Sequence, residues 1–242
     1  MLAHRVAIPL VVAGALAACA GAGDDRPAPS PQASDAAPSP NLAAALECPA
    51  LQPGQPTVAQ QRAFVGEVGT LATRAEERYG VPAAALTAMA ILESGYGQTQ
   101  LARNANNLLG WKSFPGVDAG ERDSWGLECP GRGVIDRFVV FRDRADGIDY
   151  VSSQLASSDN YRADTERYRR DRASDADVVE AVNRWVDGIA DPYSSDPEAF
   201  RSAVRRIMSD SYETGEGTEE TLYRLSEAAS PPRAQSAEAA AR

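Results

Sequence analysis

Glu93 is the carboxylate of this sequence whose position most favours proton-transfer chemistry. It follows Leu86 and Met89 by seven and four residues, so it shares their apolar face on a predicted helix. Burial against apolar side chains and the negative C-terminal end of the helix both raise the pKa of a carboxyl group. A carboxyl group that stays protonated near neutral pH can donate a proton to a glycosidic oxygen. Glu93 is therefore a candidate general acid, and its alternative interpretation is a solvated glutamate at a helix end.

The residues that follow Glu93 form an ordered set of motifs. They are Glu93-Ser94-Gly95-Tyr96-Gly97, then Leu101-Ala102, then Asn106-Asn107-Leu108-Leu109-Gly110-Trp111-Lys112. Their order and spacing resemble the signature of glycoside hydrolase family 73, the bacterial glucosaminidases that cut cell-wall peptidoglycan. Two later matches, Phe141-Arg142 and Asp191-Pro192-Tyr193, extend the resemblance over about residues 60–210. The resemblance implies an α+β, lysozyme-like fold, with a mostly helical lobe, a small β-lobe and an active-site cleft between them.

The resemblance also implies roles for particular side chains. Glu93 corresponds to the proton donor, and Tyr193 to a tyrosine that supports the reacting centre by contacting the N-acetyl group or by holding water. A second carboxylate is expected in the β-lobe, where Glu128 is our candidate. Without a second carboxylate close by, assistance by the substrate's N-acetyl group or attack by water becomes the better mechanism. The alternatives to Glu128 are Glu121, Asp123 and Asp136.

Aromatic and amide side chains near these motifs are candidate sugar contacts. Aromatic faces suit the apolar faces of sugar rings, and amides suit acetamido groups. The residues expected to line the cleft are Tyr96, Asn107, Trp111 and Trp125. Asn106 and Asn107 are alternatively ordinary turn residues, and Tyr193 is alternatively a packed tyrosine whose hydroxyl has one partner.

The resemblance therefore implies a peptidoglycan hydrolase that cleaves the β-1,4 glycosidic bond after N-acetylglucosamine, with Glu93 as general acid. A lytic transglycosylase or a lysozyme-like muramidase is the first alternative, since such enzymes also carry a glutamate before a serine. The segment from Asn106 to Trp111 matches the glucosaminidases better. The second alternative is a catalytically inactive glycan-binding lipoprotein.

Residue counts argue against several other classes of protein. The single histidine, His4, lies in the expected export signal, so we expect neither a zinc site nor a Ser-His triad, and no cofactor. The net charge is -10, and binding of nucleic acid requires a clustered basic surface, so we do not expect nucleic acid as a partner. The chain has no glycine-rich phosphate-binding motif. We expect a monomer whose partner is the glycan strand of peptidoglycan.

The N-terminal residues have the features of an export signal. A short basic start, the apolar run Val6 to Leu16 and a small-residue stretch predict a signal peptide over residues 1–18. The stretch Leu16-Ala17-Ala18-Cys19 resembles a bacterial lipobox, which implies lipidation of Cys19; the alternative is an ordinary cleaved signal. Residues 19–56 are rich in proline and alanine and predict a tether. Because Ala20 is not the aspartate that retains lipoproteins at the inner membrane, we expect an outer-membrane anchor facing the periplasm.

Lipidation of Cys19 leaves two cysteines, Cys48 and Cys129. In an oxidising compartment an even pair of cysteines favours a disulfide, so we expect these two to be joined. Two free thiols are the alternative interpretation.

Helical spacing and stop signals outline the domain that positions these residues. A capping box of Thr57 and Gln60 predicts the start of a helix that Gly80 stops, and Pro82 opens a second helix that runs to Glu93. Residues 113–142 predict a small hairpin-like β-lobe. Helical patterns follow at 144–157, 175–187 and 197–212, and an arginine-rich face at 162–172 is expected to be solvated. We expect the domain to span residues 57–213, followed by a weakly structured polar tail over 214–242.

Overall fold

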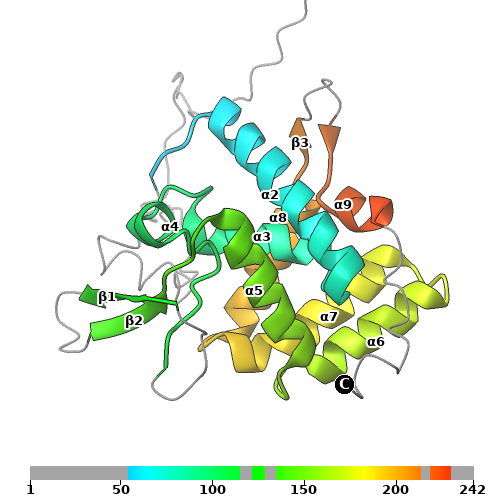
Figure 1. Ribbon diagram of the computed structural model, residues 1–242. Helices are drawn as coiled ribbons and strands as arrows, with labels where there is room; N and C mark the ends of the chain where they lie inside the picture. The colour runs from blue at the N-terminus through cyan, green and yellow to red at the C-terminus, as the bar shows by residue number, and fades with distance from the viewer. Residues whose placement is uncertain (1–53, 115–121, 129–134, 214–218, 230–242) are drawn as a thin grey trace, which may run out of the picture. The chain divides into compact units, whose positions relative to one another are not determined.

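The computed structural model describes residues 54–114, 122–128, 135–213 and 219–229 (Figure 1). They belong to the second of two units, Pro38–Arg242. The signal peptide, the tether, Cys19, Cys48 and Cys129 lie outside the described residues. The elements run in the order α2 (Val58–Tyr79), α3 (Ala83–Ser94), α4 (Gln100–Ala105), β1 (Ser124–Glu128), β2 (Ile135–Val139), α5 (Arg144–Ser157), α6 (Arg162–Ala173), α7 (Val178–Tyr193), α8 (Pro197–Ser209), β3 (Tyr212–Glu213), β4 (Glu219–Glu220) and α9 (Tyr223–Ala228).

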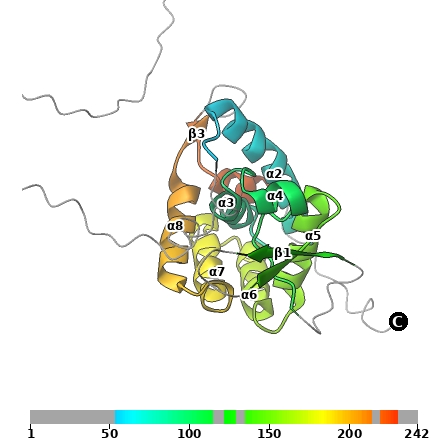
Figure 2. The same ribbon diagram turned by 90° about the vertical axis from the view of Figure 1, so that its left-hand side faces the viewer.

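Helix α3, which carries Glu93, lies among other helices on every side. Its residues from Ala83 to Ile91 are all buried, and it packs against α2, α7, α8 and α9 (Figures 1 and 2). Alanines are frequent along the helix, and their small side chains let the neighbouring helices approach closely. A helix that is apolar all round is stable in water only inside a core, so α3 is the centre around which the helical lobe assembles.

The ends of α2 confirm the signals expected from the sequence. Thr57 accepts the backbone N–H of Gln60, and the Gln60 side chain accepts the backbone N–H of Thr57, which completes the capping box. Gly80 ends the helix with a left-handed φ of 69°. A side chain at this position would also collide with Arg169, so both the backbone and the surroundings require glycine.

A β-hairpin forms the small sheet expected between residues 113 and 142. Strands β1 and β2 are antiparallel, with Trp125 opposite Phe138, and Lys112 adds a bridge to the free side of β2. The hairpin has its own small core, in which Leu127 and Phe138 contact Leu101 and Ala105 of α4. The views in Figures 1 and 2 show the hairpin beside α4. This mixture of helices and one small hairpin confirms the expected α+β class.

The structure also describes residues beyond 213, where the sequence-based domain boundary lies. Beyond β3 and β4, helix α9 packs against α2, α3 and α7, and Leu222, Tyr223 and Ser226 are buried. The sequence concealed this because the segment contains few large apolar residues, and those few are the ones that face the core. The expected helices at 144–157, 175–187 and 197–212 are present as α5, α7 and α8, and α7 extends six residues further, to Tyr193. None of the helices in the described ranges combines the length and apolar character needed to cross a membrane.

A fully buried carboxyl group, that of Glu76 near the end of α2, joins four helices. Its Oε2 accepts hydrogen bonds from the Ala83 backbone N–H (2.7 Å) and from the Ser226 hydroxyl (2.8 Å). Its Oε1 accepts one from the Tyr168 hydroxyl (2.6 Å), and Arg172 Nε lies 3.5 Å away. Burial raises the pKa of Glu76, while these donors act in the opposite direction. The helices α2, α3, α6 and α9 are therefore held at one point.

We predict that Glu76→Ala lowers the free energy of unfolding by about 3–5 kcal/mol, because it leaves buried donors and Arg172 without their acceptor. The measurement is urea unfolding monitored by circular dichroism. Glu77→Ala is the matched control, since Glu77 is exposed on the same turn of α2. A loss for Glu76→Ala no larger than that of the control would contradict the central role of this carboxyl group.

Candidate active site

Glu93 lies in the last turn of α3, where the chain leaves the helix in a tight left-handed turn. Gly95, Tyr96 and Gly97 have φ values of 54°, 58° and 74°. Ser94 fixes this turn, because its hydroxyl donates to the Ala90 carbonyl (2.5 Å) and accepts the Gly97 N–H (2.8 Å). The motif after Glu93 therefore serves to end the helix sharply beside the carboxyl group.

The backbone of a second segment, 108–112, lies against the Glu93 carboxyl group. An ideal Cβ built on Gly110 would sit 3.2 Å from Glu93 Oε2, and Gly110 has a φ of 63°. Both the close approach and the left-handed backbone favour glycine here. Glu93 is half-buried in these surroundings, and burial raises its pKa to about 7. The structure thus gives Glu93 the proton affinity that the sequence predicted.

Tyr193, at the end of α7, also lies against this segment. Its hydroxyl donates a hydrogen bond to the Leu109 carbonyl (2.6 Å), one residue before Gly110. Burial raises the pKa of Tyr193 well above its usual value, and the negative charge of Glu93 adds to the effect. The structure therefore brings Glu93, Gly110 and Tyr193 together, although they are distant in the sequence.

An aromatic triangle supports Tyr193. The rings of Trp111, Tyr161 and Tyr193 have pairwise centroid distances of 6.4 Å, and Phe200 lies 5.1 Å from Tyr193. The Tyr161 hydroxyl donates to the carbonyl of Pro192, next to Tyr193 in the chain (3.2 Å). Sequence reasoning missed Tyr161, because it stands between two helices with no motif around it.

Asn107 has a different position from the one expected of a sugar contact. It is 1% exposed, and its Nδ2 donates to the carbonyls of Trp111 and Val139, both at 2.9 Å. Its Oδ1 accepts the Trp111 N–H, also at 2.9 Å. The preceding Asn106 has a left-handed φ and donates to the carbonyls of Phe141 and Arg142. Both amides therefore hold the segment 108–112 and the base of the hairpin, which is the turn-residue interpretation.

The other expected site residues are distributed around this centre. Tyr96 is half-buried with its ring edge on Phe64 of α2, and burial together with the charge of Asp210 raises its pKa. Trp125 is partly buried on β1, where it packs against the small core of the hairpin. Glu128 ends β1, with its backbone paired to Ile135, but its side chain lies outside the described parts of the chain.

The alternatives to Glu128 differ in their surroundings. Asp136 forms an ion pair with Lys112, with 3.0 Å between Oδ1 and Nζ. Asp123 is exposed, and its carbonyl accepts the Val140 N–H. Glu121 lies outside the described residues. Asp136 thus has a cationic partner on the hairpin side of the site, whereas Asp123 faces solvent.

Comparison with solved structures gives several matches of low sequence identity. The catalytic domain of the autolysin Auto from Listeria monocytogenes is 18% identical, with 72% of this chain and 89% of that one covered and a TM-score of 0.46. A peptidoglycan hydrolase from Sphingomonas sp. A1 is 20% identical, with 73% and 99% covered and a TM-score of 0.46. The glycoside hydrolase domain of FlgJ from Salmonella typhimurium is 21% identical, with 61% and 87% covered and a TM-score of 0.41. A comparison with curated protein sequences gave no match.

A half-buried carboxyl group of raised pKa, set in an α+β fold of helices and one hairpin, has the character of a glycoside hydrolase site. A family model described as mannosyl-glycoprotein endo-beta-N-acetylglucosaminidase matches residues 69–213, which is more than half of the chain. The chain belongs to this glucosaminidase family and is a glycoside hydrolase. The match includes Glu93, Gly110 and Tyr193.

We predict that Glu93→Gln gains stability relative to the parent as the pH rises. Below about pH 4 the carboxyl group is protonated in both the folded and unfolded states, so it adds no pH dependence. Between about pH 4.5 and 7 the unfolded chain loses the proton while the folded chain keeps it, so the parent loses up to about 3 kcal/mol, and the loss is complete above the folded pKa.

Urea unfolding of both proteins at pH 4 and pH 8 measures this difference. Glu77→Gln, at an exposed position, is the control for the loss of one glutamate. A stability difference between Glu93→Gln and the parent that is the same at pH 4 and pH 8 would show that burial does not perturb the Glu93 carboxyl group.

Proposed function

We propose that this protein hydrolyses bacterial peptidoglycan at the β-1,4 bond after N-acetylglucosamine, with Glu93 as the general acid. The single observation that carries the proposal is the position of Glu93, in the last turn of α3 and against the backbone of Gly110, where burial raises its pKa to about 7. The motif around Glu93 supports the choice of substrate, as do the names of the similar proteins, two of which are called peptidoglycan hydrolase and autolysin.

In this proposal Glu93 protonates the glycosidic oxygen as the bond to the leaving sugar breaks. The departing alcohol takes the proton, and positive charge develops at the anomeric carbon of the N-acetylglucosamine. The Glu93 carboxylate that remains then accepts a proton from the water that completes hydrolysis. Family 73 is compatible with a second carboxylate or with assistance by the acetamido group, and the geometry of Tyr193 bears on this choice.

Tyr193 has only acceptor capacity left for the substrate. Its hydroxyl lies 2.6 Å from the carbonyl oxygen of Leu109, which can only accept, so the tyrosine proton must point there. The lone pairs of the hydroxyl then face other groups and can accept the N–H of a substrate acetamido group. Such a hydrogen bond strengthens as the acetamido oxygen attacks the anomeric carbon and the nitrogen becomes more positive. We therefore favour assistance by the N-acetyl group over Glu128 as the base.

The sequence-based localisation is part of this proposal. A lipid anchor on Cys19 and the tether over residues 19–56 would hold the enzyme at the outer membrane, within reach of periplasmic glycan strands. These features, and the monomeric state, stay predictions of the sequence.

We predict that Glu93→Gln lowers turnover of purified peptidoglycan by about 10²-fold or more, because an amide keeps the shape of the side chain but cannot donate the proton. The parent should lose activity above about pH 7, as Glu93 ionises. Mass spectrometry of the released muropeptides identifies the products. Reducing N-acetylglucosamine ends support the proposal, whereas anhydro ends indicate a transglycosylase, reducing N-acetylmuramic acid ends a muramidase, and no products an inactive binding protein.

We predict that Tyr193→Phe lowers turnover by about 10²-fold and that Glu128→Ala lowers it by less than about tenfold, because the acetamido oxygen is the nucleophile and no second carboxylate has to activate water for the first attack. Turnover of both variants on purified glycan strands is the measurement, with thermal melting as the check on folding. The reverse order would make Glu128 the base that activates water. Near-parental activity in both would mean that neither residue supports the reacting centre.

A further inference from the structure

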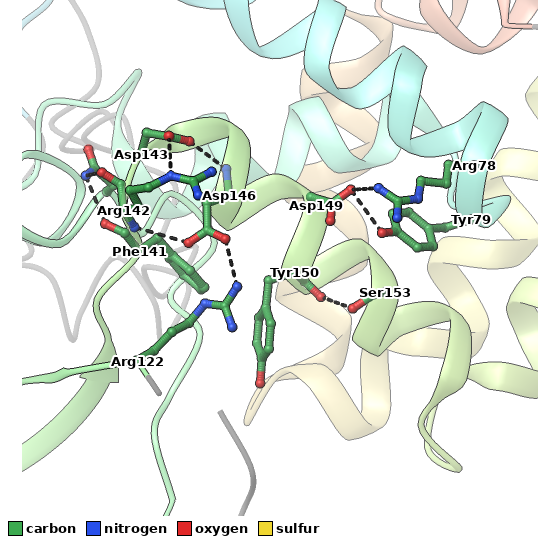
Figure 3. Close-up of polar contacts among 11 residues, drawn as sticks. Arg78, Tyr79, Arg122, Phe141, Arg142, Asp143, Asp146, Asp149, Tyr150 and Ser153 are labelled. Atoms are coloured by element: carbon green, nitrogen blue, oxygen red, sulfur yellow. Dashed lines mark hydrogen bonds and ion pairs between the residues drawn. The ribbon is translucent and has the colours of Figure 1, made fainter. Parts of the chain in front are cut away.

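One carboxylate in the first turn of α5 is bonded to both ends of the β-hairpin. Asp146 Oδ1 accepts a hydrogen bond from Arg122 Nη2 (2.7 Å), and its Oδ2 accepts the backbone N–H of Arg142 (3.1 Å). Arg122 comes two residues before β1, and Arg142 comes three residues after β2. Figure 3 shows the two bonds converging on Asp146. The side chain of Asp146 therefore joins the two ends of the hairpin at its base.

The Arg122 guanidinium group is held by aromatic rings as well as by charge. It lies 4.5 Å from the ring centroid of Tyr150 and 5.9 Å from that of Phe141, within the range of about 6 Å for cation–π contacts. The side chains of Arg122 and Asp146 are 28% and 16% exposed. Partial burial weakens solvent screening, and the planar guanidinium group can stack and donate at the same time, which a lysine cannot.

The charges around this contact are otherwise paired. Asp143 accepts the Asp146 N–H as the N-cap of α5, and its other oxygen accepts a hydrogen bond from Arg142 Nε. Burial acts to raise the pKa of Asp146, but the hydrogen bonds from Arg122 and from the Arg142 backbone outweigh it, so the pKa is lowered. Asp146 is thus a carboxylate at neutral pH, as an ionic contact with Arg122 requires.

The base of the hairpin is connected to the candidate active site through Val139, the last residue of β2. Its N–H donates to the Trp111 carbonyl (3.1 Å), and its carbonyl accepts from Asn107 Nδ2 (2.9 Å). Trp111 follows Gly110, which lies against Glu93, and its ring contacts Tyr193. A shift of the hairpin relative to α5 would therefore reach the segment that lies against the acid.

We propose that Arg122 is a positioning residue: by joining Asp146, Tyr150 and Phe141, it fixes the β1–β2 hairpin on α5 and holds the hairpin side of the site in place for the glycan. Arg122 acts through the hairpin and does not touch the reacting atoms. This role rests on the proposed function, because it concerns the binding of the same substrate.

The chain contains a matched control for this contact. Arg78 Nη1 lies 2.9 Å from Asp149 Oδ1, and its guanidinium group lies 4.9 Å from the Tyr79 ring centroid. Like the contact of Arg122, this one combines an arginine, an aspartate of α5 and an aromatic ring. Figure 3 shows the two contacts side by side. The contact of Arg78 joins α5 to α2, however, and not to the hairpin.

The experiment compares Arg122→Met with Arg78→Met, since methionine keeps an apolar stem but removes the charge and the hydrogen bonds. Hydrogen–deuterium exchange of the peptides covering 122–128 and 135–141 should be about tenfold faster in Arg122→Met and unchanged in Arg78→Met. On purified glycan strands, Arg122→Met should raise KM by about tenfold and lower kcat by less, because Glu93 and Tyr193 stand on α3 and α7 and only the segment 108–112 is linked to the hairpin. Arg122→Lys should recover less than half of the lost affinity, because it restores the charge without the planar stack.

Unchanged exchange in the hairpin of Arg122→Met would overturn the proposal, as would a change in KM no larger than that of Arg78→Met. Faster exchange with unchanged KM and kcat would also overturn it, since the contact would then only stabilise the fold. If the parent itself releases no muropeptides, the proposed function fails, and the exchange comparison still decides whether Arg122 fixes the hairpin. Melting temperatures of the two variants within a few degrees of each other exclude general unfolding as the cause.

Discussion

The fold depends on the accommodation of one buried carboxyl group, that of Glu76, where α2 ends and α3 begins. Burying a carboxyl group without partners costs several kcal/mol, so its environment must supply donors. Here they come from the first turn of α3, from Tyr168 of α6 and from Ser226 of α9. Because the donors belong to different helices, satisfying this group requires that these helices take one relative arrangement. The orientation of α3 follows from that arrangement.

The two ends of α3 have opposite electrostatic effects on the carboxyl groups beside them. Glu76 sits at the N-terminal end, where the backbone N–H of Ala83 points at it and the helix dipole favours negative charge. Glu93 sits at the C-terminal end, where the dipole disfavours negative charge and burial raises the pKa to about 7. Glu76 is fully buried and Glu93 partly buried, and the first is compensated by several donors that join helices. The second is poised to exchange a proton, which is what an acid catalyst requires.

The sequence predicted those features that depend on neighbouring residues. The capping box at Thr57, the stop at Gly80 and the apolar face that carries Glu93 are all local patterns, and the structure confirms them. The family motif added Tyr193, which lies close to Glu93 only because of how α7 packs. Tyr161, the donors around Glu76 and the burial of α9 were not foreseen, because each depends on contacts between residues far apart in the chain. The position of Asn107 was also hidden from the sequence. Its amide could have bound a sugar, but in the structure it forms hydrogen bonds with the backbone of Trp111.

Gly110 has a consequence for how the acid can be adjusted. The backbone of this residue is left-handed, and any Cβ would lie 3.2 Å from the carboxyl oxygen of Glu93. A side chain at this position would be strained by the left-handed backbone and would press on the acid. Other residues that bury Glu93 carry no such double restriction. A change in the pKa of this acid is therefore more easily made through the packing of α3 and of the neighbouring end of α7.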